Sequence, residues 1–176
     1  MNTKGLFHIY TGDGKGKTTC ALGLAIRAAG AGKKVAIVQL MKGRDCGELS
    51  SLGLIPGIEV LRLSRDMGFT KNADCSTIGE MRKENDENMK KAIERAERGD
   101  CDMLIIDEAF GAYSTDTVDR GLIDGIAEKK PAELELVMTG RNAPGHLVEL
   151  ADYVTEMKLI KHPFNEGVPA RKGIEF

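Results

Sequence analysis

The stretch Thr11-Gly12-Asp13-Gly14-Lys15-Gly16-Lys17-Thr18-Thr19 decides the fold that this sequence predicts. An apolar run at 6–10 precedes it and an alanine-rich segment at 20–29 follows it, an order typical of a strand, a glycine-rich turn and the start of a helix. Glycines let backbone N–H groups turn inward around an anion, a lysine adds a full positive charge, and the hydroxyl after it can ligate magnesium. All residues from Gly12 to Thr19 are therefore candidates for binding a phosphate chain.

The loop departs from the usual phosphate-binding pattern. That pattern, G-x-x-x-x-G-K-[ST], has a glycine five places before Gly16, where this chain has Thr11. Counted from Gly12, the loop is one residue short. We therefore expect a phosphate path different from that in ordinary nucleotide hydrolases. A simple exposed turn is the alternative, but the strand before the loop and the helix after it favour a binding role.

The rest of the chain alternates between strand-like and helix-like segments. Continuous apolar runs or alternating patterns predict strands at 35–40, 58–63, 103–106, 134–138 and 153–160. Helical patterns occupy 18–29, 77–99, 118–127 and 144–151, with a shorter helix at 48–52, and Thr77 and Glu80 have the spacing of a capping box. This rhythm predicts a single α/β domain over residues 1–176, with three layers and a mainly parallel central sheet.

Composition limits the classes of function. The 176 residues are 41% hydrophobic and 30% charged with a net charge of -2, which gives no electrostatic case for nucleic acid or membrane binding. No apolar segment is long enough to span a membrane and the N-terminus does not resemble a secretion signal, so we expect a cytoplasmic protein. The four cysteines are scattered, which favours reduced thiols over a zinc site.

An acidic pair, Asp107-Glu108, directly follows the apolar run at 103–106. The carboxyl ends of parallel strands open onto one crevice, so this pair and the glycine-rich loop are expected to lie close together. A carboxylate there could hold magnesium directly or through water, together with Thr18. Solvated residues at a strand end are the alternative; the loop favours the metal role.

Three further side chains are candidates for ligand contacts. Arg141 follows the strand at 134–138 and would open on the same crevice, where a guanidinium could bind phosphate or ribose oxygens. Arg27 lies on the helix that follows the loop and is a second candidate of this kind. Phe69 is an aromatic residue in an irregular stretch, where it could pack in the core or face a flat organic ligand.

Taken together, these motifs resemble the bacterial ATP:corrinoid adenosyltransferase family of cobalamin biosynthesis. The resemblance covers residues 5–176, and its matching segments are 11–19, 38–43 (Val-Gln-Leu-Met-Lys-Gly), 68–70, 107–108, 139–144 (Thr-Gly-Arg-Asn-Ala-Pro), 151–157, 161–164 (Lys-His-Pro-Phe) and 167–176. It implies a RecA-like P-loop fold that transfers the 5'-deoxyadenosyl group of Mg-ATP to the cobalt of a reduced Co(I) corrinoid and releases triphosphate. It also implies a homodimer and a flavoprotein reductant.

The resemblance assigns roles to the residues already singled out. Lys17, Thr18 and Glu108 would act in catalysis, and Thr18 and Glu108 would hold magnesium with support from Asp107. The loop from Gly12 to Thr19 would bind the triphosphate, Arg27 and Arg141 would contact the nucleotide, and Phe69 would face the corrinoid. His162 would have a structural or hydrogen-bonding role, because an axial histidine works against the four-coordinate cobalt that the reaction needs.

Two residues depart from the family pattern. Enterobacterial members have a tryptophan where this chain has Lys71, and the second loop residue, often asparagine, is Asp13 here. A P-loop ATPase or small-molecule kinase is the runner-up function, and a module that binds nucleotide or corrinoid without chemistry is a third.

Overall fold

The computed structural model describes residues 4–68 and 73–175 of the chain. Its centre is a six-stranded sheet in the order β3-β2-β4-β5-β1-β6, and all neighbouring strands are parallel. The strands are β1 (Phe7–Thr11), β2 (Val35–Gln39), β3 (Ile58–Arg62), β4 (Met103–Asp107), β5 (Glu135–Thr139) and β6 (Tyr153–Glu156). The expectation of a mainly parallel sheet is confirmed.

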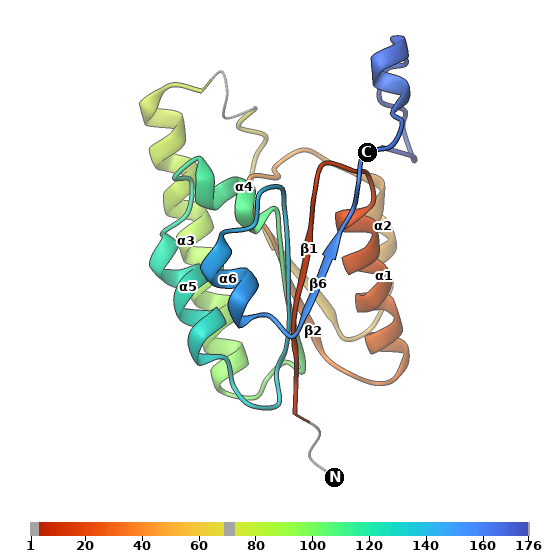
Figure 1. Cartoon of the computed structure of the whole chain (residues 1–176). Coiled ribbons are helices and arrows are strands. Elements are labelled where there is room, and N and C mark those ends of the chain that lie inside the picture. Colours follow the sequence, from red (N-terminus) through yellow and green to blue (C-terminus); the bar gives the residue numbers. More distant parts are fainter. Residues whose placement is uncertain (1–3, 69–72, 176) are drawn as a thin grey trace.

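Helices cover both faces of the sheet. They are α1 (Lys17–Gly30), α2 (Gly47–Leu52), α3 (Cys75–Glu97), α4 (Ala109–Ser114), α5 (Arg120–Lys129) and α6 (Gly145–Leu150), and a 3-10 helix spans Pro163–Glu166. Helices α1 and α2 lie on one side, and α3, α4, α5 and α6 lie on the other (Figure 1). The three-layer α/β prediction is therefore confirmed, and the architecture is consistent with a RecA-like P-loop fold.

The neighbouring strands β2 and β4 are buried on both faces. Every residue of β2 and of β4 is buried, which explains their continuous apolar runs. Alternate residues enter two separate clusters: Ile37 and Ile105 pack on the α1 side, whereas Val38 and Ile106 pack on the α3 and α5 side. The last residue of β4, Asp107, falls on the α1 side, where it bonds to Thr18.

The structure corrects several element boundaries. Helix α3 begins at Cys75, and the Asp74 side chain accepts a hydrogen bond from the Thr77 backbone N–H at 2.7 Å. The capping box expected at Thr77 is therefore wrong, because an aspartate three residues earlier caps the helix. Helix α5 begins at Arg120 rather than at 118, with Asp119 as its N-cap.

Two other corrections concern tertiary contacts. Helix α4 was not predicted; its six residues form a helix because Phe110 and Ala112 are buried in the core. Strand β6 ends at Glu156, earlier than expected, because Met157 leaves the strand to bond with the glycine-rich loop.

Two simple features of the sequence are reflected in the structure. All four cysteines are free of disulfide bonds, as the scattered spacing suggested. Among the described residues, no helix is both long enough and apolar enough to cross a membrane.

Candidate functional site

The glycine-rich loop joins the carboxyl end of β1 to the start of α1 at the upper edge of the sheet (Figure 1). Gly16 is the N-cap of α1 with φ 115°, in a region that favours glycine. Gly12 has φ 94°, and a Cβ there would lie 2.6 Å from the Met157 carbonyl oxygen. The loop is held at this close approach by a hydrogen bond of 2.6 Å from Gly14 N–H to the same oxygen. Glycines are therefore required for the turn and for its contact with the end of β6.

Lys17 is the first residue of α1, and its side chain folds over the loop. Its Nζ donates hydrogen bonds to the carbonyl oxygens of Gly12 at 2.6 Å and Gly14 at 2.8 Å. Burial lowers the pKa of Lys17, and the nearby Arg141 charge lowers it further, while nearby carboxylates act in the opposite direction. An anion bound in the loop would favour the charged ammonium and would compete with the two carbonyl oxygens for it.

Four side chains meet below the loop, and we call Thr18, Lys42, Asp107 and Thr139 the floor of the crevice. Asp107 is fully buried. Its Oδ1 accepts hydrogen bonds from Thr18 Oγ1 at 2.9 Å and Thr139 Oγ1 at 2.6 Å, and its Oδ2 accepts one from Lys42 Nζ at 2.7 Å. Burial alone would lower the pKa of Lys42, but the charge and hydrogen bond of Asp107 outweigh it and raise that pKa. The floor thus contains an ion pair between Lys42 and Asp107, and both carboxylate oxygens of Asp107 accept hydrogen bonds.

Glu108 follows Asp107 in a strained backbone conformation with φ 59°. Its N–H donates to Thr139 Oγ1 at 3.0 Å, so one hydroxyl connects both acidic residues. Burial, and then the Asp107 charge, raise the pKa of Glu108. Among the residues that the structure describes, no hydrogen bond or ion pair ends on the Glu108 carboxylate, which leaves its oxygens available to a ligand.

The oxygen groups of the crevice suit a magnesium ion that binds together with phosphates. Magnesium is usually held by one or two carboxylates with substrate phosphates and waters. The crevice offers the Thr18 hydroxyl and the carboxylates of Asp107 and Glu108, and the described residues contain no richer His, Cys, Asp and Glu cluster. Gln39 lies beside Asp107 in register and is fully buried, and neither of its amide atoms has a hydrogen-bond partner among the residues that the structure describes. A buried amide without a partner could form a hydrogen bond with a water molecule bound to the ion.

Charged side chains above the floor form what we call the rim: Asp13, Lys15, Arg141 and Glu175. Arg141 Nε lies 3.7 Å from Asp13 Oδ1. Lys15 Nζ lies 2.8 Å from Glu175 Oε1, and Arg171 also bonds the Glu175 carboxylate. Hydrogen bonds from Arg171 and then from Lys15 lower the pKa of Glu175 to about 2. The C-terminal segment is therefore tied to the loop by one ion pair, between Lys15 and Glu175, and by a hydrogen bond of 3.3 Å from Lys15 Nζ to the Ile174 carbonyl oxygen.

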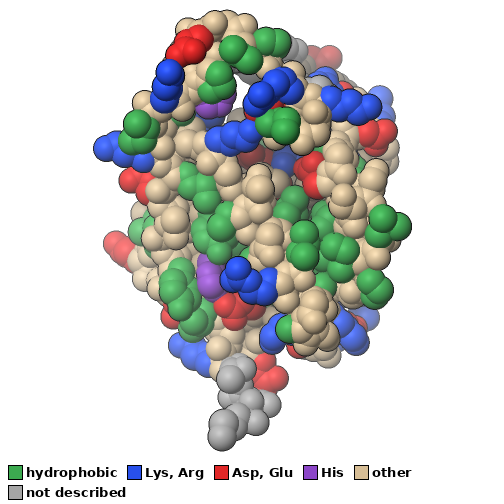
Figure 2. Space-filling view, turned by 90° about the vertical axis from the view of Figure 1, so that its right-hand side faces the viewer, with side chains coloured by type: hydrophobic (Ala, Val, Ile, Leu, Met, Phe, Trp, Pro, Cys, Tyr) green, Lys and Arg blue, Asp and Glu red, His purple; other side chains and the backbone are tan. Residues whose placement is uncertain are grey.

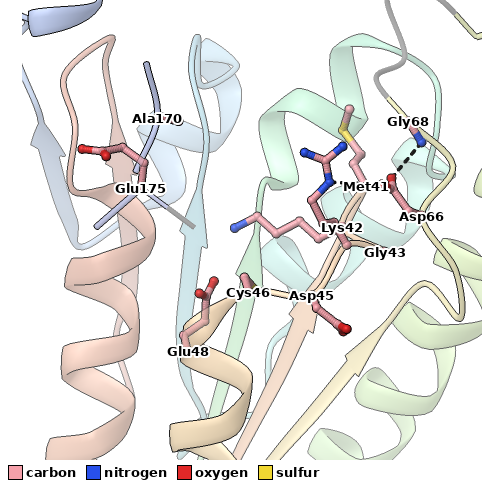
Figure 3. Close-up of a pocket in the computed structure, with 11 residues that line it drawn as sticks. Met41, Lys42, Gly43, Asp45, Cys46, Glu48, Asp66, Gly68, Ala170 and Glu175 are labelled. Carbon is pink, nitrogen blue, oxygen red and sulfur yellow. Dashed lines mark hydrogen bonds and ion pairs between the residues drawn. The ribbon is translucent and has the colours of Figure 1, made fainter. Parts of the chain in front are cut away.

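Three adjoining cavities surround this C-terminal segment. One of about 370 Å³ is lined by Asp13, Gly14, Lys15, Gly16, Lys17, Thr18, Thr19, Glu108, Arg141, His162, Ile174 and Glu175. A second of about 590 Å³ lies between α1 and α2, and a third of about 380 Å³ lies beside the segment 41–48. Glu175 lines all three. Figure 2 shows basic side chains around an opening near the top of the α1 face, and Figure 3 shows the third cavity between Met41, Lys42 and the C-terminal segment.

The structure brings most of the predicted site residues together, with two exceptions. The loop, Glu108 and Arg141 line one cavity, and Asp107 bonds Thr18 beneath it. Arg27 instead lies in the last turn of α1, at the end of the helix away from the loop, so the structure does not place it with the others. Phe69 and Lys71 lie outside the described residues.

Sequence reasoning missed four residues of this region: Gln39, Lys42, Thr139 and Glu175. Gln39 is the last residue of the buried strand β2, just as Asp107 is the last residue of β4, and Lys42 follows three residues later. A position at or just beyond the carboxyl end of a buried parallel strand was therefore a usable signal for both. Thr139 could have been found in the same way at the end of β5. No signal in the sequence connects Glu175 with Lys15.

The comparisons with known proteins agree on one family. The family described as "ATP:corrinoid adenosyltransferase BtuR/CobO/CobP" matches residues 3–176. A corrinoid adenosyltransferase of a Sinorhizobium species is 38% identical over 98% of this chain and 81% of its own length. The corrinoid adenosyltransferase of Escherichia coli K12 is 31% identical over 100% of this chain and 88% of its own. That of Salmonella typhimurium LT2, called CobA, is 29% identical over 98% and 86%.

Proposed function

The chain belongs to the ATP:corrinoid adenosyltransferase family, and we propose that it transfers the 5'-deoxyadenosyl group of Mg-ATP to the cobalt of a reduced Co(I) corrinoid, releasing triphosphate. The reaction would serve the synthesis or salvage of adenosylcobalamin. In this proposal the electron pair of Co(I) forms the cobalt–carbon bond, the bond from C5' to oxygen breaks, and its electrons leave with the triphosphate. No side-chain base is needed for this displacement.

The observation that supports the proposal best is the position of Lys17 and Thr18. They lie side by side at the start of α1, and both line the cavity that also contains Glu108 and Arg141. A leaving triphosphate gathers negative charge, and preorganised cations and N–H donors stabilise such charge most effectively. We therefore assign to Lys17 the stabilisation of the departing triphosphate, and to the loop from Gly12 to Thr19 the binding of its phosphates.

Magnesium would be held by Thr18 and Glu108, with Asp107 supporting Thr18 through their 2.9 Å hydrogen bond. When bound, the ion neutralises phosphate charge and makes triphosphate a better leaving group. Arg141 would contact the nucleotide from the rim. For Arg27 the same role remains a prediction, and its position in the last turn of α1 does not support it.

The experiment that tests the function uses ATP, magnesium and chemically reduced cobalamin. We expect light-sensitive adenosylcobalamin and one triphosphate per turnover. The runner-up, an ATPase or small-molecule kinase, would give ADP and phosphate, or a phosphorylated product, without a corrinoid product. Intact ATP bound in the presence of reduced corrinoid would instead indicate a binding module. Either result would refute the proposed transfer.

Phe69 is proposed to face the corrinoid and to help displace its lower axial ligand. We expect Phe69→Ala to slow transfer to cobalamin more than transfer to cobinamide, which lacks that ligand. Equal losses would place Phe69 in a structural role. A homodimer, a flavoprotein reductant and a cytoplasmic location are also proposed, from the resemblance and the composition of the sequence.

A further inference from the structure

Lys42 lies where a cation bound to the floor would lie. Its Nζ is 2.7 Å from Asp107 Oδ2 and 3.5 Å from Thr18 Oγ1. In the proposed function Thr18 holds magnesium together with Glu108, and Asp107 supports them. Asp107 is fully buried, so its charge requires a partner, and the Lys42 ammonium is that partner in this structure. The floor is thus already neutralised before any metal arrives.

The backbone holds Lys42 in this position. Met41 has φ 60°, a left-handed conformation that is strained for a residue with a side chain. Arg62 Nε donates a hydrogen bond to the Lys42 carbonyl oxygen at 3.3 Å. In Figure 3 the Lys42 side chain extends from the end of β2 across the crevice, toward the side where Glu48 and Glu175 lie. A strained turn with a fixed carbonyl indicates that the placement is specified rather than incidental.

Only a ligand that offers Lys42 a new anion can release Asp107 at low cost. A divalent ion alone would compete with the ammonium for a desolvated carboxylate and would leave that ammonium without a counter-charge. A metal that arrives with a triphosphate brings phosphate oxygens to the glycine-rich loop, and Lys42 lines the adjoining cavity beside Thr18 and Glu175, which also line the loop cavity. Both cations can then be neutralised together.

We propose that Lys42 is a positioning residue that makes metal binding depend on the triphosphate: it neutralises Asp107 in the nucleotide-free protein and moves to a phosphate oxygen when the metal–triphosphate complex binds. The inference rests on the proposed function only in taking a metal–triphosphate as the ligand. Its test needs neither corrinoid nor turnover, so it can fail while adenosyl transfer stands.

The test measures Mn²⁺ binding to the nucleotide-free protein by electron paramagnetic resonance. We expect Lys42→Met, which removes the charge but keeps most of the side-chain volume, to bind Mn²⁺ about tenfold or more tightly than the wild type, because the ammonium no longer competes. Lys42→Arg keeps a cation and should bind Mn²⁺ as weakly as the wild type. In the double variant Lys42→Met/Asp107→Asn, the gain in Mn²⁺ affinity should be abolished.

Lys15→Met is the matched control, because it removes a lysine charge from the rim rather than from the floor. Unchanged Mn²⁺ binding by folded Lys42→Met would overturn the proposal, and so would an equal gain in Lys15→Met, which would indicate a general charge effect. Circular dichroism establishes that each variant is folded. If Lys42→Met is not, Lys42→Gln retains an N–H donor for Asp107 and provides the same comparison.

Discussion

The floor and the rim of the crevice both contain pairs of opposite charge, but their surroundings differ. On the floor, Asp107 is fully buried and receives three hydrogen bonds. On the rim, the Arg141 and Asp13 side chains are 66% and 67% exposed and lie 3.7 Å apart. Buried charges are costly to leave unpaired, whereas exposed pairs contribute little to stability. We therefore expect substitutions on the floor to affect folding and metal binding together, and those on the rim to affect ligand binding or the anchoring of the C-terminal segment with little effect on global stability.

The largest effect is expected at Lys17, which lies between the two regions. Lys17→Ala should reduce the rate of adenosyl transfer by about 10²–10³-fold, the range seen when one preorganised donor to a developing negative charge is removed. Its hydrogen bonds end on two loop carbonyls, so the fold should remain intact. Spectroscopic measurement of adenosylcobalamin formation, with thermal unfolding as control, tests this. Near-normal turnover would contradict the role.

The floor itself is tested by Asp107→Asn. The change removes the charge that neutralises Lys42, and we expect a loss of about 2–4 kcal/mol in the free energy of unfolding, because the lysine is left partly buried and unpaired. Urea denaturation measures it. Glu108→Gln is the matched control: it also neutralises a carboxylate, but one without an ion pair among the described residues, so its loss should be much smaller. Equal losses would mean that the ion pair does not stabilise the floor.

A smaller loss in the free energy of unfolding is expected for Thr139→Val, which keeps the shape of the side chain but removes its hydroxyl. Thr139 Oγ1 donates to Asp107 and accepts from the Glu108 N–H, so one buried acceptor and one backbone donor lose a partner. Each unsatisfied group costs about 1–3 kcal/mol, and we expect a total near the lower end because the Asp107 carboxylate keeps its other hydrogen bonds. Thr155→Val, on the exposed edge strand β6, is the control and should be close to neutral. A neutral Thr139→Val would show that the hydroxyl is not needed to hold the acidic pair.

On the rim, the contacts of Glu175 should respond to pH. Its pKa is lowered to about 2, so the contacts with Arg171 and Lys15 are present above the ordinary glutamate pKa and are lost as pH falls toward 2. Glu175→Gln should reproduce that loss near neutral pH and make the C-terminal segment a few-fold more susceptible to trypsin at Arg171 and Lys172, because exposed contacts open easily. Unchanged cleavage would indicate that Glu175 does not anchor the segment.

The difference between floor and rim also explains what could be predicted from the sequence. Apolar runs and the glycine-rich loop predicted the sheet, the main helices and the meeting of Thr18 with Asp107, because strand ends in a parallel sheet converge. Helix α4 was missed because burial of Phe110, not local propensity, makes it helical. Rim contacts such as Lys15 with Glu175 join residues 160 positions apart and have no periodic signature. They depend on a chain path that no local pattern specifies.

The smallest effect is expected at Asp13, the loop residue where the family often has asparagine. Its carboxylate faces Arg141, which would otherwise be available to the nucleotide. Asp13→Asn removes a negative charge near the triphosphate and releases Arg141, so we expect ATP to bind about two- to threefold more tightly at low salt, with the gain reduced at high salt by screening. Titration calorimetry measures this, and stability should change by less than about 0.5 kcal/mol. In an Arg141→Ala background the gain should shrink, because part of it comes from the released guanidinium. Weaker ATP binding by Asp13→Asn would instead mean that the ion pair holds the loop in its binding conformation, and the rim would then share the structural role that we assign to the floor.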